Sequence, residues 1–258
     1  MINEAETDIR GALDAGAASV QIDFTEGRLS LKLDPSGNLL RSFIALNNQV
    51  LGRFPPDERA RIGVHVCPGG DHDSTHSADV DYEGLLPDLF TLNVGRFYLQ
   101  MASEPDRARV LRLVGNLAGP HHLIFIGVID PINQVVETAG QVRDRVLEAA
   151  SILPIEQLGT TDDCGFAPFA DDTSTSRDVA FKKIQARVEG TELAARALAA
   201  EKLSYRDVSR LPLRIVRRQD VHLVAFVAGW YREPLKPIDV SLNRSGRKPL
   251  RIPDRPAR

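Results

Sequence analysis

Short apolar runs alternate with longer amphipathic stretches along the first 195 residues of the chain. Five runs have the length and the β-branched or apolar content of buried strands: 19–24 (SVQIDF), 62–67 (IGVHVC), 96–101 (RFYLQM), 122–130 (HLIFIGVID) and 157–165 (QLGTTDDCG). Apolar residues recur with helical spacing in 38–52, 83–92, 104–117, 134–151 and 177–200. Near-continuous apolar strands separated by helices favour parallel pairing through right-handed crossovers. The pattern therefore predicts an α/β fold.

The segment after residue 203 differs from the rest of the chain in its charge and proline content. From Ser204 to Arg258 it holds 13 Lys/Arg against 5 Asp/Glu, whereas the whole chain has a net charge of −3. Two strand-like runs, 213–217 and 221–228, precede a Pro-rich basic end that is expected to be disordered. We therefore predict an α/β region over 1–200 and a basic C-terminal extension over 201–258.

Composition narrows the classes of function. With 258 residues and 43% hydrophobic residues the chain can bury a sizeable core, and its small net charge gives no reason to expect nucleic acid or a membrane surface as a partner. No apolar run approaches the roughly 18 residues of a membrane span, and a polar run rather than a secretory signal follows Met1. Two cysteines in a chain without these signals suggest a reducing cytoplasm, where a cysteine pair is more often metal-binding or catalytic than a disulfide.

Polar and unusual side chains collect where the predicted strands end. They are Asp23, His65 with Cys67, Gln100, Asp130, and Asp162 and Asp163 with Cys164. The carboxyl ends of parallel strands share one face, which is where α/β folds place their chemistry. The alternative is that strand-to-helix loops are polar in any case and supply helix caps. For Asp130 both readings stand: it orients a substrate or caps the next helix.

A His-x-Cys pair near the end of a strand puts two metal-binding side chains on one face, because strand side chains alternate with period two. His65 and Cys67 have this spacing, and Cys164 in DDCGF would close the site from a distant strand end. Zinc suits a His/Cys/Cys set, and three protein ligands with an exchangeable fourth position are typical of a catalytic site. The alternative is accidental spacing of two small buried hydrophobic cysteines.

The charge of such a site indicates its chemistry. Two thiolates and an imidazole leave bound zinc close to neutral, a soft centre that suits binding of a substrate thiol as its thiolate near neutral pH. Water activation for hydrolysis is more usual where histidine and carboxylate ligands dominate. The residues therefore favour S-alkylation over hydrolysis.

IGVHVC, followed far downstream by TTDDCGF and preceded by VQID, resembles the catalytic barrel of the cobalamin-independent methionine synthase family. This family shares a superfamily with uroporphyrinogen decarboxylase and the epoxyalkane to coenzyme M transferases. The resemblance covers about residues 5–198. It implies the last five or so βα units of a TIM-type (β/α)8 barrel, a Zn²⁺ cofactor held by His65, Cys67 and Cys164, and an aspartate, Asp23, that binds the amino group of homocysteine.

Two local features depart from the family pattern. Where the family has a glutamate ligand, FYLQMA places Gln100; either its carbonyl oxygen coordinates weakly, or Glu104 replaces it, or the fourth position is left for substrate. The loop 68–82 is rich in Gly, Asp and His. Its His72 and His76 could form a second metal site or a gating loop, or belong to a solvated polar loop.

The family's Gln-Ile-Asp strand is about the fourth of eight, so the first three strands have no counterpart here, and closing a barrel needs all its strands. We therefore expect a fragment or one half of an assembly, with the runs 213–217 and 221–228 or a second copy covering an open sheet edge.

The resemblance implies methyl transfer to a thiol such as homocysteine from a methylated folate or corrinoid. Alternatives are alkyl transfer to another thiol of the coenzyme M type, or a truncated half-barrel without catalysis. The expected partners are the small-molecule thiol and the methyl donor, with no nucleic acid and no membrane.

Overall fold

The sheet is parallel throughout, and its first five strands lie in sequence order. The computed structural model describes residues 2–69, 77–166, 172–204 and 225–227. The strands are β1 (Val20–Asp23), β2 (Ile62–Val66), β3 (Arg96–Leu99), β4 (Leu123–Ile129), β5 (Leu158–Asp162) and the short β6 (Ala225–Val227). Their order in the sheet is β5-β4-β3-β2-β1-β6, with every pair parallel. This confirms the predicted α/β fold and is consistent with part of a barrel.

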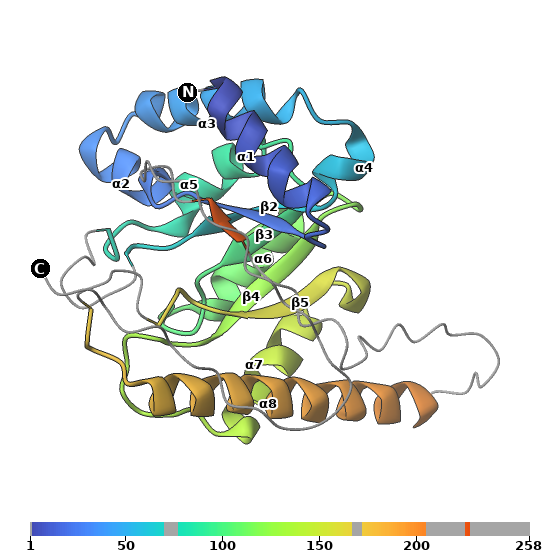
Figure 1. Ribbon diagram of the computed structural model, residues 1–258. Helices are drawn as coiled ribbons and strands as arrows, with labels where there is room; N and C mark the ends of the chain where they lie inside the picture. The colour runs from blue at the N-terminus through green and yellow to red at the C-terminus, as the bar shows by residue number, and fades with distance from the viewer. Residues whose placement is uncertain (1, 70–76, 167–171, 205–224, 228–258) are drawn as a thin grey trace, which may run out of the picture.

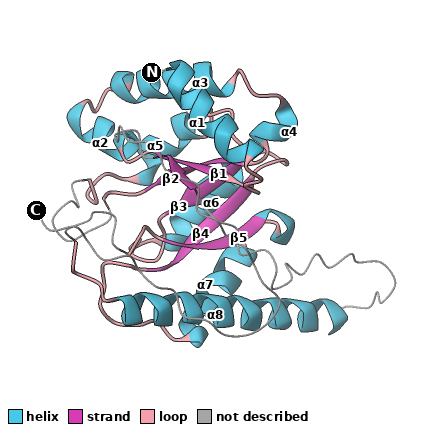
Figure 2. Cartoon of the chain, in the orientation of Figure 1, coloured by secondary structure: helices cyan, strands magenta, loops and turns pink. Residues whose placement is uncertain are grey.

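Helices follow the strands and cover the sheet (Figures 1 and 2). The five expected helices are α3 (Asn38–Leu51), α5 (Tyr82–Leu89), α6 (Arg107–Leu117), α7 (Ala139–Ala150) and α8 (Arg177–Ser204). Helices α1–α3 and α5 lie on the side of β1 and β2, whereas α7 and α8 lie beyond β4 and β5 (Figure 1). Helix α8 runs to Ser204, so the predicted boundary between residues 200 and 201 lies inside a helix.

Four further elements were not expected from the hydrophobic pattern: α1 (Ile2–Asp14), α2 (Glu26–Leu33), α4 (Pro56–Arg59) and the 3-10 turn η1 (Ile155–Gln157). Helix α1 buries only Ile9 and Leu13. Helix α2 buries Gly27, Arg28 and Ser30, so its inward face carries no apolar stripe. In α1, by contrast, Ala5, Ile9 and Leu13 recur with helical spacing, so the hydrophobic pattern could have indicated that helix.

Close packing of strand and helix layers fixes the strand ends in space. All five residues of β2 are buried, and the core continues through Leu85, Leu86 and Leu89 of α5. Helix α8 crosses α7 closely at Gly190, where a Cβ would meet the Val142 side chain and the Ala139 carbonyl. A glycine is therefore required for this approach of the two helices.

Loops after the strands are tied to the helices that follow. Asp81 accepts a hydrogen bond from the Glu83 amide at the start of α5, and Asp106 does the same for the Arg109 amide in α6. Thr138 and Gln141 form a capping box at the start of α7. These caps satisfy amides at the first turns and define where each loop ends.

The edge of the sheet at β1 is covered by part of the C-terminal extension. Strand β6, orange-red in Figure 1, pairs in parallel with β1 in the register Val20↔Ala225. This agrees with the expectation for the run 221–228, of which 225–227 is described; the run 213–217 lies outside the described residues. Among the helices that the structure describes, none combines the length and the apolar character needed to cross a membrane.

Candidate metal centre

The three side chains predicted as ligands lie together at the carboxyl end of the sheet. His65 is in β2, Cys67 follows that strand directly, and Cys164 lies two residues beyond β5. The Cys164 and Cys67 Sγ atoms are 3.3 Å apart, and the donor atoms of all three residues lie within 4.8 Å of one another. Both cysteines are free thiols. The fold thus brings together residues that are 97 positions apart in the sequence.

The donor set fits a zinc ion. His65 is 4% exposed and Cys67 is fully buried. The Nε2 atom of His65 is buried without a hydrogen-bond partner, which is uncommon for a polar atom unless something else binds it. Two sulfur ligands of one tetrahedral zinc lie about 3.8 Å apart, since each Zn–S bond is about 2.3 Å. The observed sulfur separation requires only a small adjustment to reach this value.

The electrostatics of His65 and Cys67 also suit a cation. The hydrogen bond from Cys164, together with burial, raises the pKa of Cys67 far above its ordinary value, so Cys67 stays a thiol when no positive charge is nearby. Burial acts to lower the pKa of His65, but contact with Cys67 and the charge of Asp23 outweigh it and raise the pKa. A metal ion reverses this balance because it binds thiolate and neutral imidazole.

Asp23 lies beside this group. In the parallel pairing of β1 and β2 it is the partner of His65. The residue is exposed, yet crowding of its carboxyl by protein atoms raises the pKa, an effect that the charge of His65 opposes. An exposed carboxyl next to the buried donor set is open to a bound molecule.

Asp163 holds the loop after β3 through hydrogen bonds to its backbone. Its carboxylate accepts hydrogen bonds from the backbone amides of Met101 (2.8 Å), Ala102 (2.8 Å) and Ser103 (3.1 Å). Burial raises the pKa of this carboxyl to about 6, and the three amide hydrogen bonds oppose that shift. These contacts are those of a loop-forming aspartate. They fix the position of the neighbouring Cys164.

The other two strand-end aspartates make local contacts. Asp162 pairs with Arg187 of α8 at 3.0 Å. Asp130 accepts hydrogen bonds from the amides of Ile132 (3.0 Å) and Asn133 (3.3 Å) and so shapes its own turn. Because the next helix is capped by Thr138, the interpretation of Asp130 as that helix's cap is wrong.

Gln100 and Cys67 directly follow Leu99 and Val66, which are paired at the ends of β3 and β2, so the two residues lie next to each other. Its Oε1 accepts a hydrogen bond of 2.6 Å from Arg28, and its Nε2 donates to the Ser103 hydroxyl. Glu104 is not in the group of donor atoms that lie within 4.8 Å of one another among the described residues. His72 and His76 lie outside the described residues.

Arg28 is the residue near the site that the sequence pattern did not reveal. It lies on α2, is 2% exposed, and its guanidinium stacks over the Tyr82 ring at 4.6 Å from the ring centre. A lone arginine in a short polar helix gives no periodic signal, so its burial follows only from the tertiary structure.

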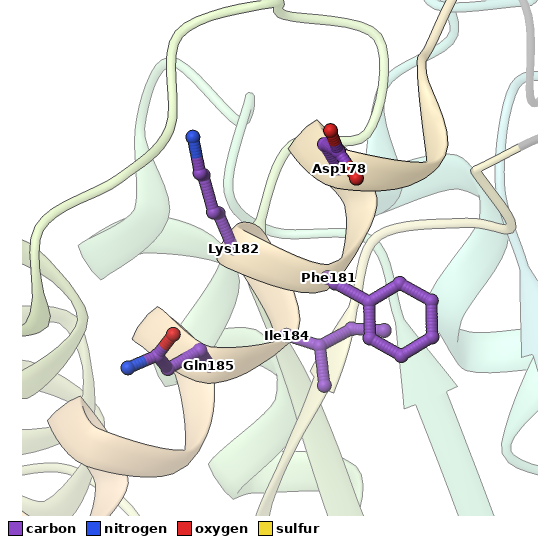
Figure 3. Close-up of a pocket in the computed structure, with 5 residues that line it drawn as sticks. All are labelled: Asp178, Phe181, Lys182, Ile184 and Gln185. Atoms are coloured by element: carbon purple, nitrogen blue, oxygen red, sulfur yellow. The ribbon is translucent and has the colours of Figure 1, made fainter.

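A hollow on α8 is a separate feature of the surface. It is lined by Asp178, Phe181, Lys182, Ile184 and Gln185, and Figure 3 shows Phe181 and Ile184 on the same side of the helix, with Lys182 directed away from them. These lining residues do not include any of the three clustered metal donors.

Comparison with known proteins gives no match to a family model, but it does give related sequences. The chain is 34% identical over 122 residues to a 2-hydroxypropyl-CoM lyase of Xanthobacter autotrophicus, covering 47% of this chain and 29% of that protein. It is 22% identical over 186 residues to a methionine synthase of Saccharolobus solfataricus and 26% identical over 176 residues to one of Methanothermobacter marburgensis. These alignments cover 72% and 68% of this chain, and 47% of each relative.

Solved structures show the same fold. A B12-independent methionine synthase from Shewanella sp. W3-18-1, in complex with selenomethionine, superposes with a TM-score of 0.57 at 19% identity, covering 76% of this chain and 53% of that one. A putative vitamin-B12 independent methionine synthase from Listeria monocytogenes gives a TM-score of 0.52 at 22% identity, with the same coverage of each chain. The chain thus spans less than half the length of the curated relatives it matches. The chain is similar in sequence to part of several methionine synthases and has the α/β fold of part of the two solved structures.

Proposed function

We propose that this chain holds Zn²⁺ through His65, Cys67 and Cys164 and takes part in methyl or alkyl transfer to a thiol. The observation that carries the proposal is the group of three donors within 4.8 Å, with the buried Nε2 atom of His65 left without a partner. Relatives named methionine synthase and 2-hydroxypropyl-CoM lyase support thiol alkylation as the class of reaction.

Zinc bound by two thiolates and an imidazole supplies a soft, nearly neutral centre at which a substrate thiol is held as its thiolate. The residues of the chain then have distinct tasks. His65 and Cys67 provide donors from one strand, and Cys164 provides the third from the end of β5. Asp163 keeps Cys164 and the loop after β3 together through its amide hydrogen bonds.

We assign to Asp23 the task of orienting the thiol substrate. It is exposed and is the register partner of His65, so its carboxylate can bind an ammonium group of a ligand seated against the donor set. An amino-acid thiol such as homocysteine fits this arrangement, and a methylated folate or corrinoid is the proposed donor. Holding thiol and donor together is a large part of the barrier reduction in a two-substrate transfer.

A second candidate reaction is alkyl transfer to a thiol of the coenzyme M type. It is favoured by the 34% identity to the 2-hydroxypropyl-CoM lyase. A thiol without an ammonium group cannot pair with the Asp23 carboxylate, so a substitution of Asp23 distinguishes the two reactions. Asp23→Asn is expected to weaken homocysteine binding strongly and to leave coenzyme M binding nearly unchanged.

Metal analysis of the purified full chain tests the proposed centre. About one zinc per chain is expected, and Cys67→Ser combined with Cys164→Ser should abolish it. His65→Asn should weaken zinc binding, while the exposed His121→Asn serves as the matched control. Full zinc occupancy in the double serine variant would rule out the site. Methyl transfer from methyltetrahydrofolate to homocysteine, and alkyl transfer to coenzyme M, then distinguish the two reactions.

A further inference from the structure

Helix α8 carries a second apolar face besides the one that packs inside the molecule. The inward face consists of residues that the fold buries: Lys183, Ala186, Gly190 and Ala194. Another face carries a row of uncharged, mostly apolar side chains at alternating spacings of three and four positions: Phe181, Ile184, Val188, Thr191, Ala195 and Leu198. We call this row the α8 seam. Its Phe181 is 59% exposed and its Val188 is 49% exposed, so these apolar side chains face the surface.

The exposed part of the seam does not hold α8 in the molecule. Within the described part of the chain, the hydrophobic core includes Ala186 and Ala194 of α8 but not Phe181, Ile184 or Val188. Figure 3 shows Phe181 and Ile184 on one side of the helix. Contiguous exposed apolar side chains rimmed by polar ones mark interaction surfaces. The seam is therefore a candidate interface.

The spacing of the seam fits a second helix. Apolar positions that alternate by three and four residues allow two helices to pack side by side, each side chain entering a hole between four residues of the facing helix. An extended segment would instead match a period of two. The seam extends over 181–198, about 26 Å of helix at about 1.5 Å per residue. Because packing on α7 already holds α8 in its helical form, a partner helix would find a preorganised surface.

The charges beside the seam favour a second copy of the same helix, aligned in parallel. Arg187 flanks the seam just before Val188, and Glu192 flanks its other side just after Thr191. In a parallel pair of helices, flanking positions five residues apart meet across the interface. Each Arg187 would thus lie beside Glu192 of the partner subunit, whereas an antiparallel pair would bring like charges together.

Both flanking residues also have ion-pair partners within their own chain. Arg187 lies 3.0 Å from Asp162, and Glu192 lies 3.5 Å from Arg196. Arg187 nevertheless remains 28% exposed and Glu192 55% exposed. The charges across the interface therefore add little to the affinity and mainly set the direction of the two helices.

We propose that the α8 seam is the interface of a homodimer in which two α8 helices pack in parallel. Burial of the apolar side chains supplies the affinity, and a twofold dimer is the commonest form of oligomer. The seam includes none of the three clustered metal donors, so the proposal does not depend on the zinc site.

Sedimentation equilibrium of the purified full chain, from about 1 to about 100 µM, tests the proposal. A reversible monomer–dimer equilibrium is expected. Val188→Asp should raise the dissociation constant at least about tenfold, because the interface would bury an unpaired carboxylate. Lys182→Asp is the matched control: it places the same acid on the exposed side of α8 that Figure 3 shows directed away from the seam, and should change the constant less than about twofold.

A second pair of variants tests the parallel alignment. Glu192→Lys would place a lysine beside Arg187 of the partner subunit and should raise the dissociation constant about threefold. Glu189→Lys makes the same change of charge at an exposed position outside the seam and should change the constant less than about twofold. All four positions are exposed, and circular dichroism checks that each variant is folded.

Three outcomes overturn the dimer: a monomer at every concentration, a dimer that survives Val188→Asp, or equal weakening by Lys182→Asp. Equal effects of Glu192→Lys and Glu189→Lys overturn the parallel alignment, because the flanking charge would then not meet its opposite across the interface. Sedimentation needs no bound metal, so loss of zinc in the double serine variant and loss of the dimer are separate results.

Discussion

The Sγ atoms of Cys67 and Cys164 are 3.3 Å apart although the two residues follow strands that are not neighbours in the described sheet. A disulfide bond needs only a closer approach, to about 2.05 Å. Treatment of the metal-free chain with diamide is therefore expected to join these two cysteines within one molecule, as each thiol loses a proton and the pair gives two electrons to the oxidant. Zinc should prevent this if it binds as proposed, because it would hold both sulfurs as ligands.

Thiol counting under denaturing conditions checks this expectation. The number of free thiols should fall from two to none in the metal-free chain and stay at two with zinc. Disulfide-linked dimers as the main product, or equal oxidation with and without zinc, would contradict it.

Gly127 makes room for the Asp163 carboxylate. A Cβ at this position would collide with Asp163 Oδ1 and lie 2.8 Å from the Met101 amide nitrogen. Gly127→Ala is therefore expected to lower the free energy of unfolding by about 1–3 kcal/mol and to weaken zinc binding through displacement of Cys164. Gly11→Ala is the matched control, because nothing lies within 4 Å of a Cβ there; in helix α1 it should stabilise the fold by up to about 1 kcal/mol. Urea unfolding and chelator competition measure both effects.

Lys183 is fully buried and pairs with Glu137 at 2.8 Å. Its Nζ also donates to the Val135 carbonyl at 2.6 Å. Lys183→Met should destabilise the fold by about 3–5 kcal/mol, since the Glu137 charge would remain buried with only the more distant Arg145, at 3.8 Å, to pair with it. The neighbouring exposed Lys182→Met should stay within about 0.5 kcal/mol. Addition of Glu137→Gln should recover part of the loss; no recovery in urea unfolding would mean that packing of Lys183, and not its charge, matters.

His122 gives the stability a pH dependence away from the metal centre. Its ring lies 5.0 Å from that of Phe97, and burial, with a smaller effect of the His121 charge, lowers its pKa. The unfolded chain, with a pKa near 6.5, binds a proton at a higher pH than the folded chain does. Stability should therefore fall as the pH drops below about 6.5 and level off below the folded pKa.

His122→Asn removes this titration while offering an oxygen to the Gly119 amide in place of Nδ1. The difference in urea midpoint between about pH 7.5 and about pH 5.5 should shrink in this variant. An unchanged difference would show that other groups cause the pH dependence.

The central strands could be predicted because most are uninterrupted apolar runs that the sheet buries on both faces, as in β2. The His65 and Cys67 pair could be predicted because its spacing is a local property of a strand. The convergence of Cys164 could not be predicted from spacing, since it depends on how β3 and β4 stack between the two sites. The sequence indicated only that Cys164 ends a strand on the same face as His65 and Cys67, and the resemblance to a known family added that it is a ligand of the same ion.

Helix α2 and the burial of its Arg28 could not be predicted from the pattern of hydrophobic residues. The buried residues of α2 are Gly27, Arg28 and Ser30, so the hydrophobic pattern gave no prediction for a segment that folds as a helix. The partners of Arg28 lie 72 and 52 residues away, at Gln100 and Val80. Contacts between polar groups so far apart in the sequence cannot be predicted from the spacing of hydrophobic residues.

The sheet order has a mechanical consequence for the cysteine pair. Strands β2 and β5 are separated by β3 and β4, and at about 4.8 Å per strand step a flat sheet would hold their ends roughly 14 Å apart. Contact between the two sulfurs thus requires strong curvature, to which the irregular pairing between Gly127 and Ile129 contributes. A cation bound by both sulfurs would act as a cross-link that resists flattening. Metal affinity and the bending of the sheet are therefore thermodynamically linked, and whatever straightens the strands also releases the ion.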